Sequence, residues 1–349
     1  MRHVSTLFYV RALVCERLGG DTIAAILAMR TLVTILGLVV SISAVGAPPA
    51  STIEANRVLL MGAALGRADL VAHALAQGAD PNARDEHNGN TALHMAAHLR
   101  DMEVLDYLLT HGADPNIGSS RDGRTPLILA ARQSGGLKVL VELFASGADV
   151  DQPARDGATA LMSASVRGHA HITATLLANR ADPNAVSHDG RSALHRAAMT
   201  GRQEIVEQLL AAGALLEKRA RDGNTPLGTA VYFGQANVVE RLIGAGADLD
   251  RSARDGETPL MLAVRENHPE ILAILLRRGA NANTQVESNG KTALILAAER
   301  DLVDVTRLLL DAGAEVNHRA HDGGTPLVAA QAIGDTETAA LLCKAGARE

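Results

Sequence analysis

The chain has 349 residues, a formal net charge of −6 and an aromatic content of 2%. Nucleic-acid-binding proteins usually carry a basic excess, so this charge gives no support for that class. The scarcity of aromatic residues favours thin helical layers, packed through small side chains, over one large globular core. Only two cysteines are present, so an internal disulfide is excluded if the segment around Cys15 is removed.

Residues 1–47 are predicted to be an N-terminal extension followed by a secretory signal peptide. Met29 is the expected start, and a basic residue, an apolar run and then small residues up to position 47 follow it. We expect cleavage after Gly46 and a periplasmic or secreted product. Two alternatives stay open: an uncleaved membrane anchor, for which the apolar run is short, and a cytosolic protein.

Residues 48–86 are predicted to form a linker and an N-terminal capping repeat. A proline pair makes a stiff spacer, and Ser51-x-x-Glu54 has the pattern of a capping box that opens a helix. A second apolar helix follows before Gly78. A terminal repeat covers one open face of the core, which explains why this unit lacks the start found in later ones.

From residue 87 onward a Gly-x-Thr or Gly-x-Ser pattern recurs every 33 or 34 residues. We assign seven full repeats to 87–320 and a C-terminal capping repeat to 321–349. A fixed period of this length indicates a stack of supersecondary units with one continuous core. The glycines that carry the pattern are Gly89, Gly123, Gly157, Gly190, Gly223, Gly256, Gly290 and Gly323.

The repeat that begins near Arg221 predicts a turn and two short helices. Thr225 has the chemistry of an N-cap, and Pro226 suits the first helical position because it has no N–H to leave unpaired. A second apolar helical face runs from Val238 to Ile243, and Gly246 is expected to end it in a left-handed conformation. Neither helix buries its apolar face alone, so each repeat needs neighbours.

The last repeat is smaller and more polar than the others, as a C-terminal cap should be. Its cysteine, Cys343, is expected to pack in the core. It stands at the position that other repeats fill with Leu109, Leu177 and Leu210.

At its repeat starts the chain resembles the ankyrin repeat family. The segments that match the Thr-Pro-Leu-His signature begin at Thr125, Thr225, Thr258 and Thr325, and His is kept in the related segments that end at His94 and His195. The resemblance implies an all-α, ankyrin-repeat solenoid of stacked helix-turn-helix units joined by β-hairpin-like loops. It also implies that the two histidines tie neighbouring repeats together by hydrogen bonds.

The same resemblance implies a function in binding another protein without catalysis. Similarity to exported bacterial ankyrin proteins suggests an accessory, inhibitor or chaperone-like role beside an enzyme. We expect no cofactor, no small-molecule substrate and no nucleic acid, and contact with a membrane only if the N-terminal segment is uncleaved. The alternative is a membrane-anchored ankyrin scaffold.

No arrangement of side chains suggests catalysis or a metal site. His169 and His171 are two residues apart and would point to different faces of a helix, whereas metal-binding pairs are usually four apart. The recurring Asp before Gly, as in Asp222, is explained by turn chemistry.

The ends of the first helices predict a partner-binding strip on the concave side. Val166, Met199 and Tyr232 would form its apolar centre, since these positions are not needed for the core. An alternative for Phe233 is that its ring folds back onto the second helix. The complete strip is Arg132, Val166, Arg167, Met199, Tyr232, Phe233 and Arg265.

Basic residues also recur at the turns, directly before the turn aspartates. Each is expected to pair loosely with an Asp of its own or the neighbouring turn, and the row could also steer an acidic partner. These turn-tip residues are Arg121, Arg155, Arg221 and Arg254.

Overall fold

The computed structural model describes residues 52–334 and 336–348. These residues contain helices and no strand longer than an isolated bridge. The helices are α3 (Thr52–Leu65), α4 (Ala68–Ala76), α5 (Ala92–Leu99), α6 (Met102–Thr110), α7 (Pro126–Ala131), α8 (Leu137–Ala145), α9 (Ala160–Arg167), α10 (Ala170–Ala178), α11 (Ala193–Met199), α12 (Gln203–Ala211), α13 (Pro226–Tyr232), α14 (Ala236–Gly244), α15 (Pro259–Arg265), α16 (Pro269–Arg277), α17 (Ala293–Ala298), α18 (Val303–Asp311), α19 (Pro326–Ala332) and α20 (Thr336–Lys344).

The chain divides into two compact units. Unit 1 comprises Met1–Ala130 with Lys138–Ala148, and unit 2 comprises Ala131–Leu137 with Asp149–Glu349. In the described part of unit 1, α3 packs on α4 and α5, and α6 packs on α4 and α5. The predicted extension and signal peptide, and Ser51 of the predicted capping box, lie outside the described residues.

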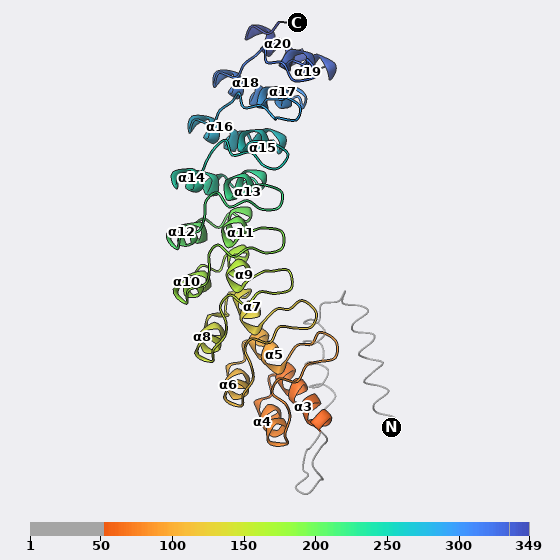
Figure 1. Ribbon diagram of the computed structural model, residues 1–349, viewed down its shortest axis with the longest axis vertical. Coiled ribbons are helices and arrows are strands. Elements are labelled where there is room, and N and C mark those ends of the chain that lie inside the picture. Colours follow the sequence, from red (N-terminus) through yellow and green to blue (C-terminus); the bar gives the residue numbers. More distant parts are fainter. Residues whose placement is uncertain (1–51, 335, 349) are drawn as a thin grey trace, which may run out of the picture. The chain divides into compact units, whose positions relative to one another are not determined.

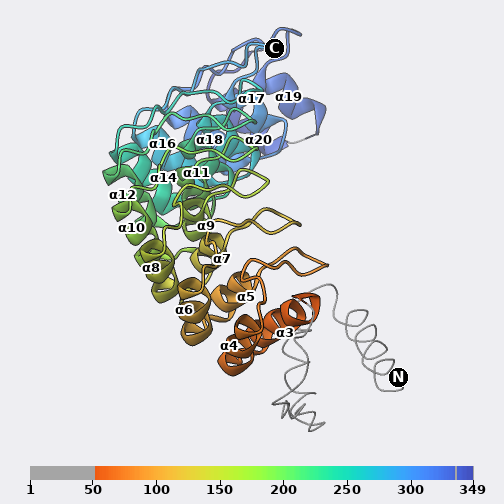
Figure 2. The same cartoon turned by 60° about the horizontal axis from the view of Figure 1, so that its bottom comes forward.

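Unit 2 is a stack of helix pairs, which confirms the predicted all-α solenoid class. The first helices of its pairs, α9, α11, α13, α15, α17 and α19, contact one another in sequence and form one row (Figure 1). The second helices, from α10 to α20, form a parallel row beside it. The loops that precede the first helices project beyond their row as fingers, as a second view also shows (Figure 2).

Local capping explains where the first helices begin. The Thr225 hydroxyl accepts a hydrogen bond from the backbone N–H of Gly228 at 3.2 Å, and Pro226 occupies the first turn of α13. Thr159, Thr258 and Thr325 cap their helices in the same way. The predicted helix start is therefore confirmed, because the hydroxyl satisfies an N–H that the helix itself leaves unpaired.

Glycine in a left-handed conformation follows the second helices, except after α10, where Arg180 has φ +66°. Gly246 has φ +94°, and the N–H of Ala247 reaches back to the carbonyl of Leu242 at 3.1 Å. This pattern satisfies carbonyls at the helix end, and a side chain would disfavour the backbone conformation that it requires. The ending predicted for the unit is confirmed.

The core lies between the two rows of helices and consists mainly of alanine, leucine and valine. Val238, Val239 and Leu242 of α14 are fully buried, in agreement with the predicted apolar face, and Ile243, the last residue of that face, is half-buried. The expectation for Cys343 is wrong, because its side chain is exposed, whereas Leu342 and Thr338 of α20 are buried. Each residue turns the helix by about 100°, so the position after the core leucine faces away from the core.

The leucines to which Cys343 was compared in other repeats also stand one residue after the core position. Leu109, Leu177 and Leu210 are only partly buried, and the fully buried leucines precede them by one residue. Those leucines are Leu108, Leu176 and Leu209.

Two of the loops contain an isolated antiparallel bridge, from Arg84 to Thr91 and from Gln285 to Thr292. The connections are thus hairpin-like without forming strands in the part of the chain that is described. No helix in that part is long and apolar enough to cross a membrane.

Candidate functional site

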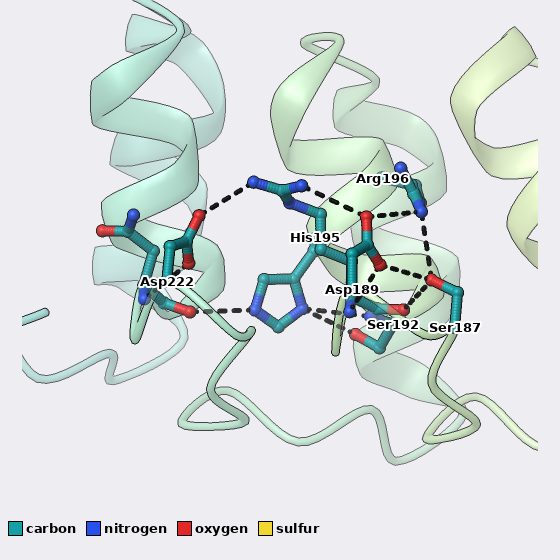
Figure 3. Close-up of polar contacts among 8 residues, drawn as sticks. Ser187, Asp189, Ser192, His195, Arg196 and Asp222 are labelled. Atoms are coloured by element: carbon teal, nitrogen blue, oxygen red, sulfur yellow. Dashed lines mark hydrogen bonds and ion pairs between the residues drawn. The ribbon is translucent and has the colours of Figure 1, made fainter. Parts of the chain in front are cut away.

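Two buried histidines, His94 of α5 and His195 of α11, each join a first helix to the turn of the following repeat. The Nδ1 atom of His195 accepts the backbone N–H of Ser192 at 3.3 Å, and Nε2 lies 3.2 Å from the carbonyl oxygen of Asn224 (Figure 3). A carbonyl can only accept, so Nε2 carries the proton and the ring is neutral. His94 has the same bonds to Thr91 and Arg124 in unit 1. The predicted structural role of both histidines is confirmed.

Protonation of these rings is strongly disfavoured. Burial lowers the pKa of His94 and of His195 to about 4. A proton on Nδ1 would also point at the backbone N–H that this atom now accepts, so the bond would be replaced by a repulsive contact. Both rings are therefore part of the scaffold.

A network of ion pairs in unit 2 engages the turn aspartates Asp189 and Asp222. Asp189 accepts hydrogen bonds from the Ser187 hydroxyl at 2.6 Å and from Arg196 at 2.9 Å, and it pairs with Arg191 at 3.2 Å (Figure 3). Arg191 continues to Asp222 of the next repeat at 2.8 Å. Partial burial would raise the pKa of Asp189, but the Ser187 and Arg191 hydrogen bonds and the charge of Arg196 lower it to about 2.

The turn-tip arginines do not take part in this network, and the expectation that they pair with the aspartates is wrong. Among the described residues, the side chains of the four turn-tip arginines form no ion pair, although the charge of Arg121 helps to lower the pKa of Asp122. Asp122 pairs with Arg124 instead, at 3.1 Å. The arginines that stand inside the turns or on the first helices are closer to the carboxylates than those at the tips.

The backbone of the turn-tip residues, by contrast, is held firmly. The N–H of Arg221 donates to the carbonyl of Asp189 at 2.9 Å, and the N–H of Arg254 donates to that of Asp222 at 3.1 Å. A Cβ atom added at Gly223 would lie 2.3 Å from the Arg254 nitrogen, so adjacent turns approach too closely for any other residue there. The four tip side chains are all exposed.

The predicted partner-binding strip, called the inner strip from here on, lies at the ends of neighbouring first helices in unit 2. Tyr232 and Phe233, at the end of α13, are 41% and 42% exposed, and their rings meet edge to face with centroids 5.0 Å apart. The guanidinium of Arg265, at the end of α15, lies 5.9 Å from the centre of the Tyr232 ring. The exposure of Phe233 places it at the surface rather than in the core against the second helix.

A scan against protein-family models matches the ankyrin repeats model, described as three copies, at residues 59–154, 133–220, 214–286 and 275–348. The chain belongs to the ankyrin repeat family. No curated protein matches it. Ankyrin repeats generally mediate protein–protein interactions and are typically non-catalytic. The family prediction is therefore confirmed, and the bacterial exported type stays a prediction.

The other predicted residues of this ankyrin surface differ in exposure. Val166 and Met199 are half-buried at the ends of α9 and α11, and Arg167 is exposed beside Val166. Arg132 is half-buried, and its carbonyl lies 3.1 Å from the Nε2 atom of His169. The strip thus has an exposed aromatic pair with less exposed apolar side chains beside it.

Arg265 is held in place by acids of its own ankyrin repeat. It pairs with Glu257 at 2.5 Å, Glu266 at 3.0 Å and Asp255 at 3.4 Å. Burial raises the pKa of Glu257 despite the opposing charge of Arg265. Sequence reasoning missed the roles of Glu257, Arg191 and Arg196. Their signal is a charge on the first helix or at the end of a turn, with an opposite charge two to eight residues away.

The described residues contain no group of three or more His, Cys, Asp or Glu side chains that could hold a metal ion. His169 and His171 do not act together, because His169 is bonded to a neighbouring carbonyl and His171 is exposed. The arrangement offers surfaces for contact, and Arg191 joins two repeats through Asp189 and Asp222.

Proposed function

We propose that this ankyrin repeat protein binds a partner protein through the inner strip of unit 2, with the turn tips as a second point of contact. The observation that carries the proposal is the exposed pair Tyr232–Phe233. The chain has only three tyrosines and three phenylalanines, and two of these six residues stand together on one surface. Exposed aromatic side chains surrounded by charge are typical centres of protein interfaces.

The setting of Tyr232 favours a large contribution to binding. Its ring lies between the edge contact with Phe233 and the guanidinium of Arg265, which three carboxylates hold in place. A side chain that is already ordered loses little conformational entropy when a partner covers it. Tyr232 is thus the best candidate for an anchor of the interface.

The experiment expresses three forms of the full-length chain in the organism that encodes it: wild type, Tyr232→Ala and Tyr107→Ala. Proteins crosslinked to each form are then isolated and compared. Tyr107 is a matched control, since this tyrosine of α6 stacks on His111 in unit 1 with ring centroids 4.5 Å apart. We expect a protein that wild type and the control retain and that Tyr232→Ala binds about 30-fold more weakly, as for a hot spot of about 2 kcal/mol. Equal capture by all three forms at equal helicity contradicts the proposal.

We further propose that the chain is exported, and that it acts beside an enzyme as an accessory protein, inhibitor or protector. The basic start, apolar run and small residues between positions 29 and 47 support export. The mass of the chain isolated from cells tests it. A mature N-terminus near residue 47 supports cleavage, an intact N-terminus in the membrane fraction supports the anchored alternative, and an intact chain in the cytosol contradicts both.

A further inference from the structure

In unit 2 the turn-tip arginines Arg221 and Arg254 form no ion pair with the aspartates that follow them in sequence, because these aspartates have other cationic partners. Asp156, which follows Arg155, accepts the backbone N–H of Ala158 at 3.0 Å. Asp189 is bonded to Arg191, Arg196 and Ser187, and Asp222 is bonded to Arg191. Asp255 is bonded to Arg265 in the same way. Asp189, Asp222 and Asp255 thus each have a cationic partner that comes from inside the turn or from the first helix.

The arginines at the tips therefore carry charge that no described side chain neutralises by an ion pair. Arg155, Arg221 and Arg254 are exposed, and Arg219, which donates to the Ser252 carbonyl at 2.7 Å, adds another exposed positive charge beside Arg221. Within a chain of net charge −6, this gives the fingers of unit 2 a local positive row. Such a row attracts and orients an acidic partner.

The spacing of the row is set by the stack. After Arg155, the backbone N–H of the residue at each tip is bonded to the preceding turn: His188 to Asp156 at 2.7 Å, Arg221 to Asp189 at 2.9 Å and Arg254 to Asp222 at 3.1 Å. Helices in contact lie about 8–10 Å apart, so consecutive tips advance by about the same distance. An extended peptide covers about 10 Å in three residues.

We propose that the turn tips Arg155, Arg221 and Arg254 bind an extended acidic segment of the partner protein, with acidic residues three positions apart facing neighbouring arginines. The turn that carries His188 lies between the turns of Arg155 and Arg221. The acid that faces Arg155 therefore stands six positions from the acid that faces Arg221. The repeat after that of Arg254 carries the exposed Glu287 beside its turn, and this carboxylate repels an acidic chain. The segment is therefore limited to about ten residues at this spacing.

A protein segment fits this row better than a single-stranded nucleic acid. Such nucleic acids are usually bound through aromatic side chains on which the bases stack, and the four turns at 155–158, 188–191, 221–224 and 254–257 contain no Phe, Tyr or Trp. The proposal rests on the proposed function only in taking the partner to be a protein.

The test measures fluorescence anisotropy of a labelled peptide, in which glutamate followed by two serines is repeated four times, with the full-length chain at low salt. A second peptide of the same composition has its glutamates contiguous. The variants are Arg221→Gln with Arg254→Gln, and, as a matched control, Arg277→Gln with Arg278→Gln, which removes two exposed charges from the end of α16.

We expect the spaced peptide to bind wild type and the control equally, and the tip variant about tenfold more weakly, given the modest contribution of each exposed ion pair. The contiguous peptide should bind wild type more weakly than the spaced one. No binding of the spaced peptide, equal binding by the tip variant, equal binding of both peptides, or tighter binding of oligouridylate overturns the proposal.

The Tyr232→Ala form should bind the spaced peptide like wild type, because the inner strip is not part of the row. Loss of partner capture by Tyr232→Ala without any peptide binding would therefore leave the proposed function standing and reject the acidic segment. If the peptide binds through the tips and Tyr232→Ala captures the partner as wild type does, the acidic segment stands and the inner strip is rejected as the partner-binding site.

Discussion

Acidification should destabilise this protein through the buried side chains of His94 and His195. Both rings are neutral in the fold, and burial lowers their pKa from 6.5 to about 4. In the unfolded chain they take up protons as the pH falls through 6.5. The folded state binds fewer protons than the unfolded state between pH 6.5 and 4, so stability is lost as the pH falls through this window.

The magnitude follows from the two pKa values. At pH 5 an unfolded histidine with the ordinary pKa is almost fully protonated and the buried one is almost neutral, a difference of about 2 kcal/mol for each ring. Below pH 4 the loss approaches about 3 kcal/mol for each ring. This is a large share of the stability of about 5–15 kcal/mol that is typical of a folded domain.

The assay is urea unfolding at pH 7 and pH 5, followed by circular dichroism, for wild type and for the double variant His94→Gln with His195→Gln. Repeat proteins unfold in parts, so hydrogen exchange of the Ser192 amide, which His195 Nδ1 accepts, adds a local measure. Wild type should lose about 4 kcal/mol between these pH values, and the double variant, less stable at pH 7, should lose much less. An equal loss in both would refute the reasoning.

Three further predictions concern stability and exposure. Gly228→Ala should stabilise α13 by about 0.5–1 kcal/mol in thermal unfolding, because alanine loses less backbone entropy and the new Cβ meets only the movable side chain of Asn224. Thr306→Val should stabilise by about 1 kcal/mol in urea unfolding, because the buried Thr306 hydroxyl has no hydrogen-bond partner. Cys343 should react with a thiol reagent in the folded protein as fast as in urea, because its side chain is exposed; slow reaction that urea accelerates would contradict this.

Thr225→Val is the control for Thr306→Val. The Thr225 hydroxyl accepts the N–H of Gly228, so the same chemical change should destabilise the protein by about 1 kcal/mol. A loss of stability in Thr306→Val similar to that of the control would show that its hydroxyl has a partner after all. Likewise, a loss of stability in Gly228→Ala would show that Asn224 does not give way.

Much of the fold could be predicted because it depends on interactions between residues close in sequence. Thr225 caps α13 through Gly228, three residues away, and Gly246 ends the following helix through its own backbone conformation. Once such a unit recurs at a fixed period, its neighbours are the adjacent copies, and stacking follows without knowledge of distant contacts. The sequence by itself therefore determined the helix pairs, their caps and the class of fold.

The tertiary structure alone decided which charges remain available. Asp222 is paired with Arg191, thirty-one residues earlier, and the adjacent Arg221 has no ion pair among the described residues. Likewise, the orientation of α20 places Leu342 in the core and leaves the next residue, Cys343, at the surface. Side-chain pairing depends on distances of a few ångströms between separate repeats, and a repeat pattern leaves these distances undetermined because several arginines lie near each aspartate.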